Sequence, residues 1–274
     1  MPNTSRRSNN RGKYSGSRKK GRRKVSRKRS KAPFFLAVAG ILLIGAVVAI
    51  WKYNPGNIVD KAAELLNVED ARSAVKVVHK KRVVLNVPLI NQMDDPKLYN
   101  GCEVTSLAMV LNYNGIDVTK SELADNIETV PFQYDNGEHG NPNDGFVGSV
   151  SGSTSAGLGV YHGPIYNLAK QYADNVYDLT GSNFDTVVNK VEEGHPVWTI
   201  TTTAFAPVSD FESWDTPDGK IDVTYSEHSV CITGFDRDKR VIYVNDPYGY
   251  KNREVDWNDF AAAYKQMGKQ AVYV

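Results

Sequence analysis

The stretch "LYNGCEVTSLAMVLNYNG", residues 98–115, holds one of the two cysteines of this 274-residue chain. After the cysteine, apolar residues recur at the spacing of one buried helical face, namely Val104, Leu107, Ala108 and Leu111. We expect Asn100 to cap this helix, with Glu103 reaching back to the amide of the cap as in a capping box. Asn114 and Gly115 are typical of a helix end. The pattern therefore predicts a helix whose first turn contains the cysteine.

The position of Cys102 suggests a reactive thiol. Unpaired backbone N–H groups and the positive end of the helix dipole stabilise a thiolate, so we expect the pKa of Cys102 to be lowered. A lone cysteine is also commonly a small buried apolar side chain, and this interpretation stays open. The chemistry depends on which residues can act as its partners.

The N-terminal part of the chain has a different composition from the rest. Residues 1–31 contain fourteen Lys or Arg and no acid, which leaves 19 basic and 31 acidic residues, a net charge of −12, for the remainder. Because the tail is nearly free of apolar residues, we expect it to be disordered. Such a basic block binds either anionic lipid or nucleic acid, and its place beside an apolar segment favours lipid, so no nucleic-acid partner is expected.

The apolar segment is "APFFLAVAGILLIGAVVAIW", residues 32–51, which has no charged side chain. As a helix it spans roughly 30 Å, the thickness of the hydrocarbon core of a bilayer. The positive-inside rule places residues 1–31 in the cytoplasm and the following chain outside, with Trp51 and Tyr53 as interfacial anchors. A cleavable signal peptide is the rival interpretation, although its apolar region is normally shorter. We therefore expect an uncleaved transmembrane signal anchor.

Beyond the anchor we expect a stalk over residues 52–83 and one globular domain over 84–274. Helices are predicted early in this domain and strands late, a segregation that indicates an α+β fold with an antiparallel sheet. A capping box at Thr119 and Glu122 begins a second helix, and residues 131–163, with eight glycines, are predicted to form a long functional loop. Later segments predict helices near 164–174, 183–193 and 255–267, and strands near 83–89, 195–205, 220–226, 228–236, 240–247 and 270–274.

Candidate partners for the thiol lie in the late strands. His228 begins the strand "HSVCITGFD", and Asp246 ends the neighbouring strand "VIYVND", so an imidazole and an acid can meet at one edge of a sheet. The acid would orient the imidazole, which would take the thiol proton and return it to a leaving amine. Gln92, ten residues before Cys102, can join the Cys102 backbone N–H in binding an oxyanion. Spacing alone leaves Asn245 and Asp246 as alternatives.

Four segments in order resemble the bacteriocin-processing, double-glycine leader peptidase-like domains of the papain-like cysteine peptidases. They are "VPLINQ…YNGCEVTSLAMVLNYNG", "VYDLTGSNFDTVVNKVEEGHPVW", "EHSVCITGFD" and "VIYVNDPYG", and the resemblance covers residues 84–274. It implies a papain-like fold and a triad of Cys102, His228 and Asp246 with a preceding Gln92. The leader peptidases themselves are fused to an exporter and work inside the cell, so a different peptide or protein substrate is expected here.

The same residue types could also serve a disulfide, a metal site or a cofactor site. Two external cysteines can form a disulfide, but we expect Cys231, three residues from His228, to face away as a core thiol. "DTPDGKID", residues 215–222, lacks calcium-loop spacing and is predicted to be a hairpin turn. No metal-ligand cluster, phosphate loop or dinucleotide fingerprint is present, so no cofactor or metal is expected. The other candidate bases are His139, His162 and His195, and the aromatic residues that could line a groove are Tyr161, Trp198, Trp214 and Tyr248.

The sequence thus predicts a single-pass membrane protein of a Gram-positive surface whose external domain is a cysteine peptidase or related amide hydrolase. The long loop, residues 131–163, is expected to set specificity. Two alternatives stay open, a non-catalytic module of the same fold that binds peptide or glycan, and a structural anchor between membrane and cell wall. Substitution of Cys102 separates them, because only the enzyme requires the thiol.

Overall fold

The computed structural model describes residues 79–274. The predicted basic tail, the membrane segment at 32–51 and most of the predicted stalk lie outside the described residues. Within the described part of the chain, none of the helices reaches the length and hydropathy of a membrane span.

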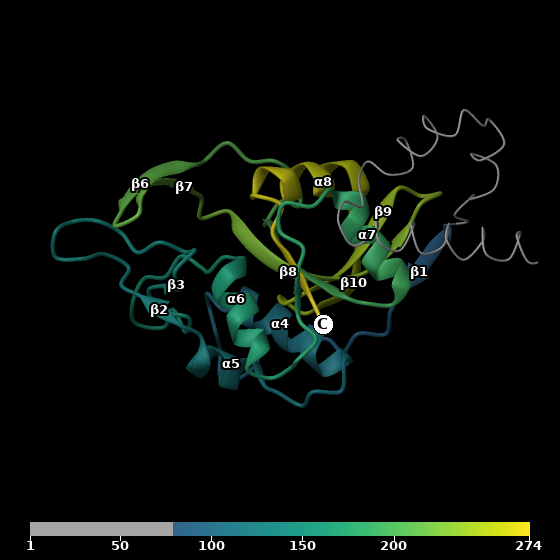
Figure 1. The fold of residues 1–274 in the computed structure, drawn as a ribbon, viewed down its shortest axis with the longest axis horizontal. Coiled ribbons are helices and arrows are strands. Elements are labelled where there is room, and N and C mark those ends of the chain that lie inside the picture. Colours follow the sequence, from purple (N-terminus) through teal and green to yellow (C-terminus); the bar gives the residue numbers. More distant parts are fainter. Residues whose placement is uncertain (1–78) are drawn as a thin grey trace, which may run out of the picture. The chain divides into compact units, whose positions relative to one another are not determined.

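A seven-stranded sheet forms the centre of the domain, and all of its pairings are antiparallel (Figure 1). The order is β10-β9-β8-β5-β11-β4, and β1 pairs with the far end of β8, beyond the end of β5. The strands are β1 (Arg82–Val84), β4 (Tyr177–Asp178), β5 (Val197–Thr202), β8 (Glu227–Asp236), β9 (Val241–Asp246), β10 (Tyr250–Asp256) and β11 (Ala271–Tyr273).

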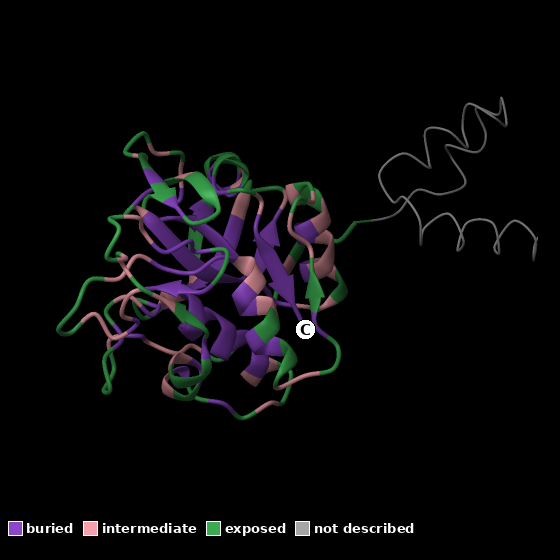
Figure 2. Ribbon diagram, turned by 60° about the vertical axis from the view of Figure 1, so that its left-hand side comes forward, coloured by how far each residue is buried: buried purple, intermediate pink, exposed green. Residues whose placement is uncertain are grey.

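Helices cover both faces of this sheet. Successive side chains of β5 and β8 point to opposite faces, and all of them are buried for this reason. Trp198 and Cys231 pack in one core with α4, α5 and α6, whereas Val197 and Ile232 pack in a second core with α7 and α8. Figure 2 shows the buried central strands between these layers. The helices are α4 (Cys102–Tyr113), α5 (Lys120–Asn126), α6 (His162–Lys170), α7 (Phe184–Glu193) and α8 (Trp257–Gln266). The predicted mixture of helices and an antiparallel sheet is confirmed.

The glycine-rich segment 131–163 is not a simple surface loop. It contributes β3 (Phe146–Val147), which pairs in parallel with β2 (Thr129–Val130), and both residues of β3 are fully buried. The segment also closes on itself through a bridge between Gly148 and Gly157. Part of the predicted specificity loop is therefore core.

The predicted turn at residues 215–222 is confirmed as a hairpin. It joins β6 (Glu212–Thr216) to β7 (Gly219–Val223), and Gly219 has a φ of 107°, which favours glycine. The structure differs from the sequence-based prediction at β6 and β10, which were not predicted because their polar, largely exposed residues lack a clear apolar alternation. The domain also begins before residue 84, since Arg82 and Val83 of the predicted stalk pair with β8.

Candidate active site

Cys102 is the first residue of α4, as predicted, but the cap differs. Gly101 occupies the N-cap position, and no side chain bonds the free backbone N–H groups. The predicted cap, Asn100, donates instead to Ser149 O at 2.8 Å. A Cβ at position 101 would lie 2.5 Å from Leu98 Cβ, so the close approach of the preceding loop requires glycine there. The predicted capping box is therefore absent, and that prediction is wrong. The predicted helix end at Asn114 and Gly115 is confirmed.

His228 and Asp246 meet at the ends of β8 and β9. The His228 Nε2 atom lies 3.0 Å from Asp246 Oδ1, and both side chains are buried. The other carboxylate oxygen, Oδ2, accepts from Arg253 Nη1 at 2.8 Å, and the Tyr248 amide donates to Oδ1 at 3.0 Å. Burial acts to raise the pKa of Asp246, but these partners, His228 first, hold it below its ordinary value.

Asn245 faces the other side of the sheet and takes no part in this pair. Its Nδ2 atom donates to the backbone carbonyls of Val87 and Pro88, and its Oδ1 atom accepts from the backbone N–H of Asn252. The alternation of side chains along a strand separates it from Asp246. Of the two alternatives that spacing left open, only Asp246 binds an imidazole.

Cys102 lies against the same end of β8 as His228. One turn further along α4, Ser106 Oγ donates to Ser229 O at 3.1 Å and so fixes the helix on the strand. The charge of Glu227 and the backbone of Ser229 both act on the pKa of the Cys102 thiol, so the thiol lies near these two residues. Cys102 is therefore near both chain neighbours of His228, although among residues 79–274 no hydrogen bond joins the thiol to the imidazole.

The Cys102 thiol forms a hydrogen bond with Glu103, a residue that the sequence predicted only as part of a helix cap. Cys102 Sγ donates to Glu103 Oε2 at 3.2 Å. Burial, followed by the charges of Glu103 and Glu227, raises the pKa of the thiol well above its ordinary value. The predicted lowering by the helix N-terminus is thus wrong for this state of the site, because desolvation and two nearby acids exceed the effect of the dipole.

Gln92 is buried in the segment before α4, but it does not present a free donor. Its Nε2 atom donates to Leu98 O at 3.0 Å and to Tyr99 O at 3.3 Å, while its Oε1 atom has no partner among the described residues. In this state Gln92 fixes the loop that leads to Cys102. An oxyanion role requires one of these bonds to be exchanged for substrate.

This geometry can be compared with known proteins. Residues 84–272 match the model of the Peptidase_C39 like family. The chain belongs to this family. It is 52% identical over 219 residues to the uncharacterized protein YvpB of Bacillus subtilis (strain 168), a match that covers 80% of this chain and 86% of that protein. It also resembles the crystal structure of a proposed C39-like peptidase from Bacillus anthracis, with a TM-score of 0.67 and 44% identity over 71% of this chain and 98% of that one.

The C39-like domain has a cavity of about 350 Å³ next to the His228–Asp246 pair. Its lining includes Tyr248, Tyr250 and Arg253. The Tyr248 ring stacks on His228 with 5.3 Å between ring centroids, and it remains about half exposed. Of the four aromatic residues considered for a groove, Tyr248 therefore lies at the site. Trp198 is fully buried in the core and donates to Glu103 O at 3.0 Å.

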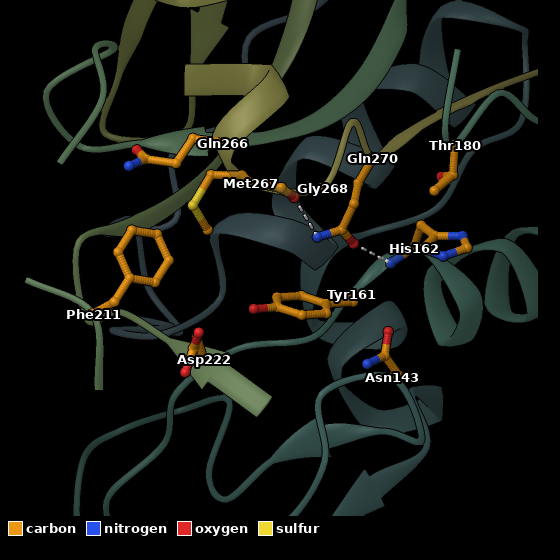
Figure 3. Close-up of a pocket in the computed structure, with 10 residues that line it drawn as sticks. All are labelled: Asn143, Tyr161, His162, Thr180, Phe211, Asp222, Gln266, Met267, Gly268 and Gln270. Atoms are coloured by element: carbon orange, nitrogen blue, oxygen red, sulfur yellow. Dashed lines mark hydrogen bonds between the residues drawn. The ribbon is translucent and has the colours of Figure 1, made fainter. Parts of the chain in front are cut away.

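The three other candidate bases have different partners. His139 contacts Phe132 O, His162 contacts Asp178 Oδ2, and His195 contacts Val274 O. His162 lines a separate cavity of about 250 Å³. Figure 3 shows that the Gln270 side-chain amide there bridges Met267 O and the His162 backbone N–H. None of the three bonds Asp246.

Both cysteines of the C39-like domain are free, and Cys231 is a fully buried core residue on the opposite face of β8 from His228, as predicted. Within residues 79–274 no group of three or more His, Cys, Asp or Glu side chains is arranged to hold a metal ion. Three residues at the site were missed by sequence reasoning, namely Glu103, Glu227 and Arg253. An acid inside an otherwise apolar helical face was the available signal for Glu103.

Proposed function

We propose that the protein is a cysteine peptidase or related amide-bond hydrolase that uses Cys102, His228 and Asp246. The observation that carries the proposal is the use of Nε2, not Nδ1, in the bond from His228 to Asp246. The Nδ1 atom, which has no hydrogen-bond partner among the described residues, is therefore the ring nitrogen left to serve the thiol. Acyl transfer by a thiol requires an imidazole that a carboxylate orients. His228 and Asp246 supply this pair at the end of β8, and α4, the helix that begins at Cys102, is fixed to the same strand by Ser106.

In the proposed reaction His228 Nδ1 takes the proton from Cys102 Sγ, and the thiolate attacks the carbonyl carbon of an amide. The carbon–nitrogen bond then breaks, the departing amine takes the proton from the imidazolium, and a thioester remains on Cys102. Water, deprotonated by His228, hydrolyses the thioester and regenerates the thiol. The Cys102 backbone N–H, with Gln92 once one of its present bonds is released, would stabilise the oxyanion.

The glycine-rich segment is the proposed specificity element, and its backbone contacts support this role. Tyr99 N donates to Ser151 O at 2.9 Å, and Asn100 N donates to Val150 O at 3.2 Å, so this segment pairs with the residues that directly precede the nucleophile. Because β3 is core, removal of residues 137–157 would unfold the domain. Shortening residues 152–155 tests specificity without removing the core.

The proposed setting is the outer face of a bacterial membrane, with residues 32–51 as the anchor and residues 1–31 on cytoplasmic anionic lipid. The support is the uncharged twenty-residue segment and the charge asymmetry that flanks it. The substrate would then be an external peptide or protein. Protease digestion of intact cells tests this orientation, because the proposal requires the C39-like domain, but not an N-terminal tag, to be cleaved.

Turnover is tested with a mixed peptide pool, the purified full-length chain and mass spectrometry. We expect cleavage by the wild type, and a loss of at least about 10²-fold in Cys102→Ala and His228→Ala. Cys231→Ala is the matched control, since it removes the other thiol from the far side of β8. Cleavage that survives in Cys102→Ala would overturn the proposal, and binding without cleavage in all variants would favour the non-catalytic module.

A further inference from the structure

Two buried acids lie beside the proposed triad, and the reaction described above uses neither. Glu103 follows Cys102 on α4 and is 1% exposed, and Glu227 precedes His228 on β8 and is 8% exposed. Buried carboxyl groups are unusual because removal of a carboxylate from water is costly unless it is paired. Their presence next to the nucleophile requires a physical account.

Glu103 is held in place from three directions. Its Oε2 atom accepts from Cys102 Sγ at 3.2 Å, its Oε1 atom accepts from the Val160 amide at 3.0 Å, and its backbone carbonyl accepts from Trp198 Nε1 at 3.0 Å. The side chain therefore has little freedom to leave the sulfur. A residue that only filled space would not need a polar contact to the thiol.

Glu227 faces Glu103, and the hydrogen bond between the two carboxyl groups requires one of them to keep a proton. Both carboxyl oxygens of Glu227 are buried, and no N–H group or hydroxyl of residues 79–274 donates to them. Gly159 packs against the two acids together, since a Cβ there would collide with Glu103 Oε1 and lie 2.9 Å from Glu227 Oε1. The absence of a side chain at position 159 leaves room for both carboxyl groups.

Two carboxyl groups this close, and away from water, cannot both ionise easily. Burial raises the pKa of Glu103 to about 7, and burial together with the charge of Glu103 raises that of Glu227 well above its ordinary value. The other titratable groups that face the pair are the Cys102 thiol and the hydroxyls of Tyr161 and Tyr248. The pair therefore retains a proton near neutral pH.

We propose that Glu103 is a positioning residue for the nucleophile, which as a carboxylate holds the Cys102 proton away from His228, and that Glu227, the acid that keeps its proton longer, favours this form of Glu103 by donating a hydrogen bond to it. When Glu103 is neutral, its acid proton can be donated toward the sulfur, and the same contact then stabilises a thiolate. The inference rests on the proposed function only in treating Cys102 as the nucleophile. This role explains why the Cys102 thiol forms its hydrogen bond with Glu103 and not with the His228 imidazole.

The test is the rate of Cys102 alkylation by iodoacetamide against pH, measured on the full-length chain in a Cys231→Ser background. Glu103→Gln keeps the shape and can still accept from Val160 N, but it presents an amide donor to the sulfur. We expect its inflection to move to lower pH than in the parent. Thiolate fraction rises about tenfold per unit of pKa decrease while intrinsic nucleophilicity falls, so the rate below the inflection should rise about threefold for each unit.

Two further variants test the contribution of Glu227 and of charge in general. Glu227→Gln keeps a donor to Glu103 and leaves the hydrogen bond between Glu103 and the sulfur intact. Because it removes a charge that raises the pKa of the thiol, it should move the inflection in the same direction by a smaller amount. Glu254→Gln, on the exposed face of β10, should leave the inflection unchanged. An unchanged or raised inflection in both Glu103→Gln and Glu227→Gln would overturn the inference. Alkylation needs no turnover, so this result is independent of whether the peptide pool is cleaved.

Discussion

The Nε2 atom of His228 lies 3.0 Å from Asp246 Oδ1, and both side chains are at most 3% exposed. A carboxylate in such a position fixes which ring nitrogen carries a proton, because the N–H of Nε2 must donate to it. Arg253 and the Tyr248 amide occupy the remaining carboxylate positions. His228 is therefore oriented before any substrate arrives, and the following predictions start from this bond.

Substitution of Asp246 should separate orientation from charge. Asp246→Ala removes the acceptor for Nε2–H, and we expect peptide cleavage to fall by about 10²-fold or more. Asp246→Asn keeps an acceptor oxygen and should retain clearly more activity. The measurement is kcat/KM for both variants on one peptide, and equal losses would show that negative charge, not orientation, is the required property.

Arg253 should protect the site against acid. The pKa of Asp246 is lowered, so its contribution to stability is present above its unfolded pKa of about 3.9 and is lost as the pH falls through the lower folded value. Arg253→Ala removes one of the partners that lower it, and we expect the midpoint of acid unfolding, followed by circular dichroism, to move to higher pH. Lys251→Ala removes the same charge from β10 without touching Asp246, and an equal shift in that variant would show that only net charge matters.

Because of the buried acids Glu103 and Glu227, we expect the stability of the domain to fall as the pH rises, the opposite of the effect of Asp246. The pKa values of Glu103 and Glu227 are raised, so the folded state binds more protons than the unfolded chain, and their contribution to stability is lost as the pH rises through about 7. The free energy of unfolding in urea should therefore decrease between pH 5 and pH 8. In Glu103→Gln this decrease should be smaller, and the same slope in both proteins would contradict the assignment.

Gly159 should be required both for its backbone conformation, with a φ of 159°, and for the space that it leaves beside the two acids. An alanine there would collide with Glu103 Oε1, and overpacking of this kind costs about 1–3 kcal/mol. Gly163→Ala is the matched control, because its Cβ would lie 3.6 Å from the nearest atom and alanine favours the helix α6. We expect thermal unfolding to show Gly159→Ala as destabilised and Gly163→Ala as unchanged or more stable.

The part of the fold that follows periodic apolar patterns was predictable, and the site was predictable only in part. The apolar spacing after Cys102 placed α4, and the alternation along β8 placed Cys231 away from His228. The choice of Asp246 over Asn245 came from resemblance, and it agrees with the bond that the structure contains. Strand alternation shows the two residues to be on opposite faces but cannot say which face His228 takes.

The misses share a physical cause, which is that distant residues override local signals. Asn100 is a good N-cap by composition, but its side chain bonds Ser149, far along the chain, so a tertiary contact replaces the cap. The local pattern predicts Glu103 as a cap residue. Its partners in the structure, Val160 and Glu227, are distant in sequence and therefore leave no local signal. For the same reason the pKa of Cys102, raised by burial, could not be anticipated from its place in a helix.

Detection of a thioester on Cys102 would identify the nucleophile directly. The full-length chain is mixed with a peptide that it cleaves, quenched in acid within the first turnover, and digested for mass spectrometry. We expect the Cys102 peptide to gain the mass of the amino-terminal product as an acyl group, and this adduct to be absent from Cys102→Ala. Cleavage without any adduct on Cys102, or cleavage that continues in Cys102→Ala, would contradict it.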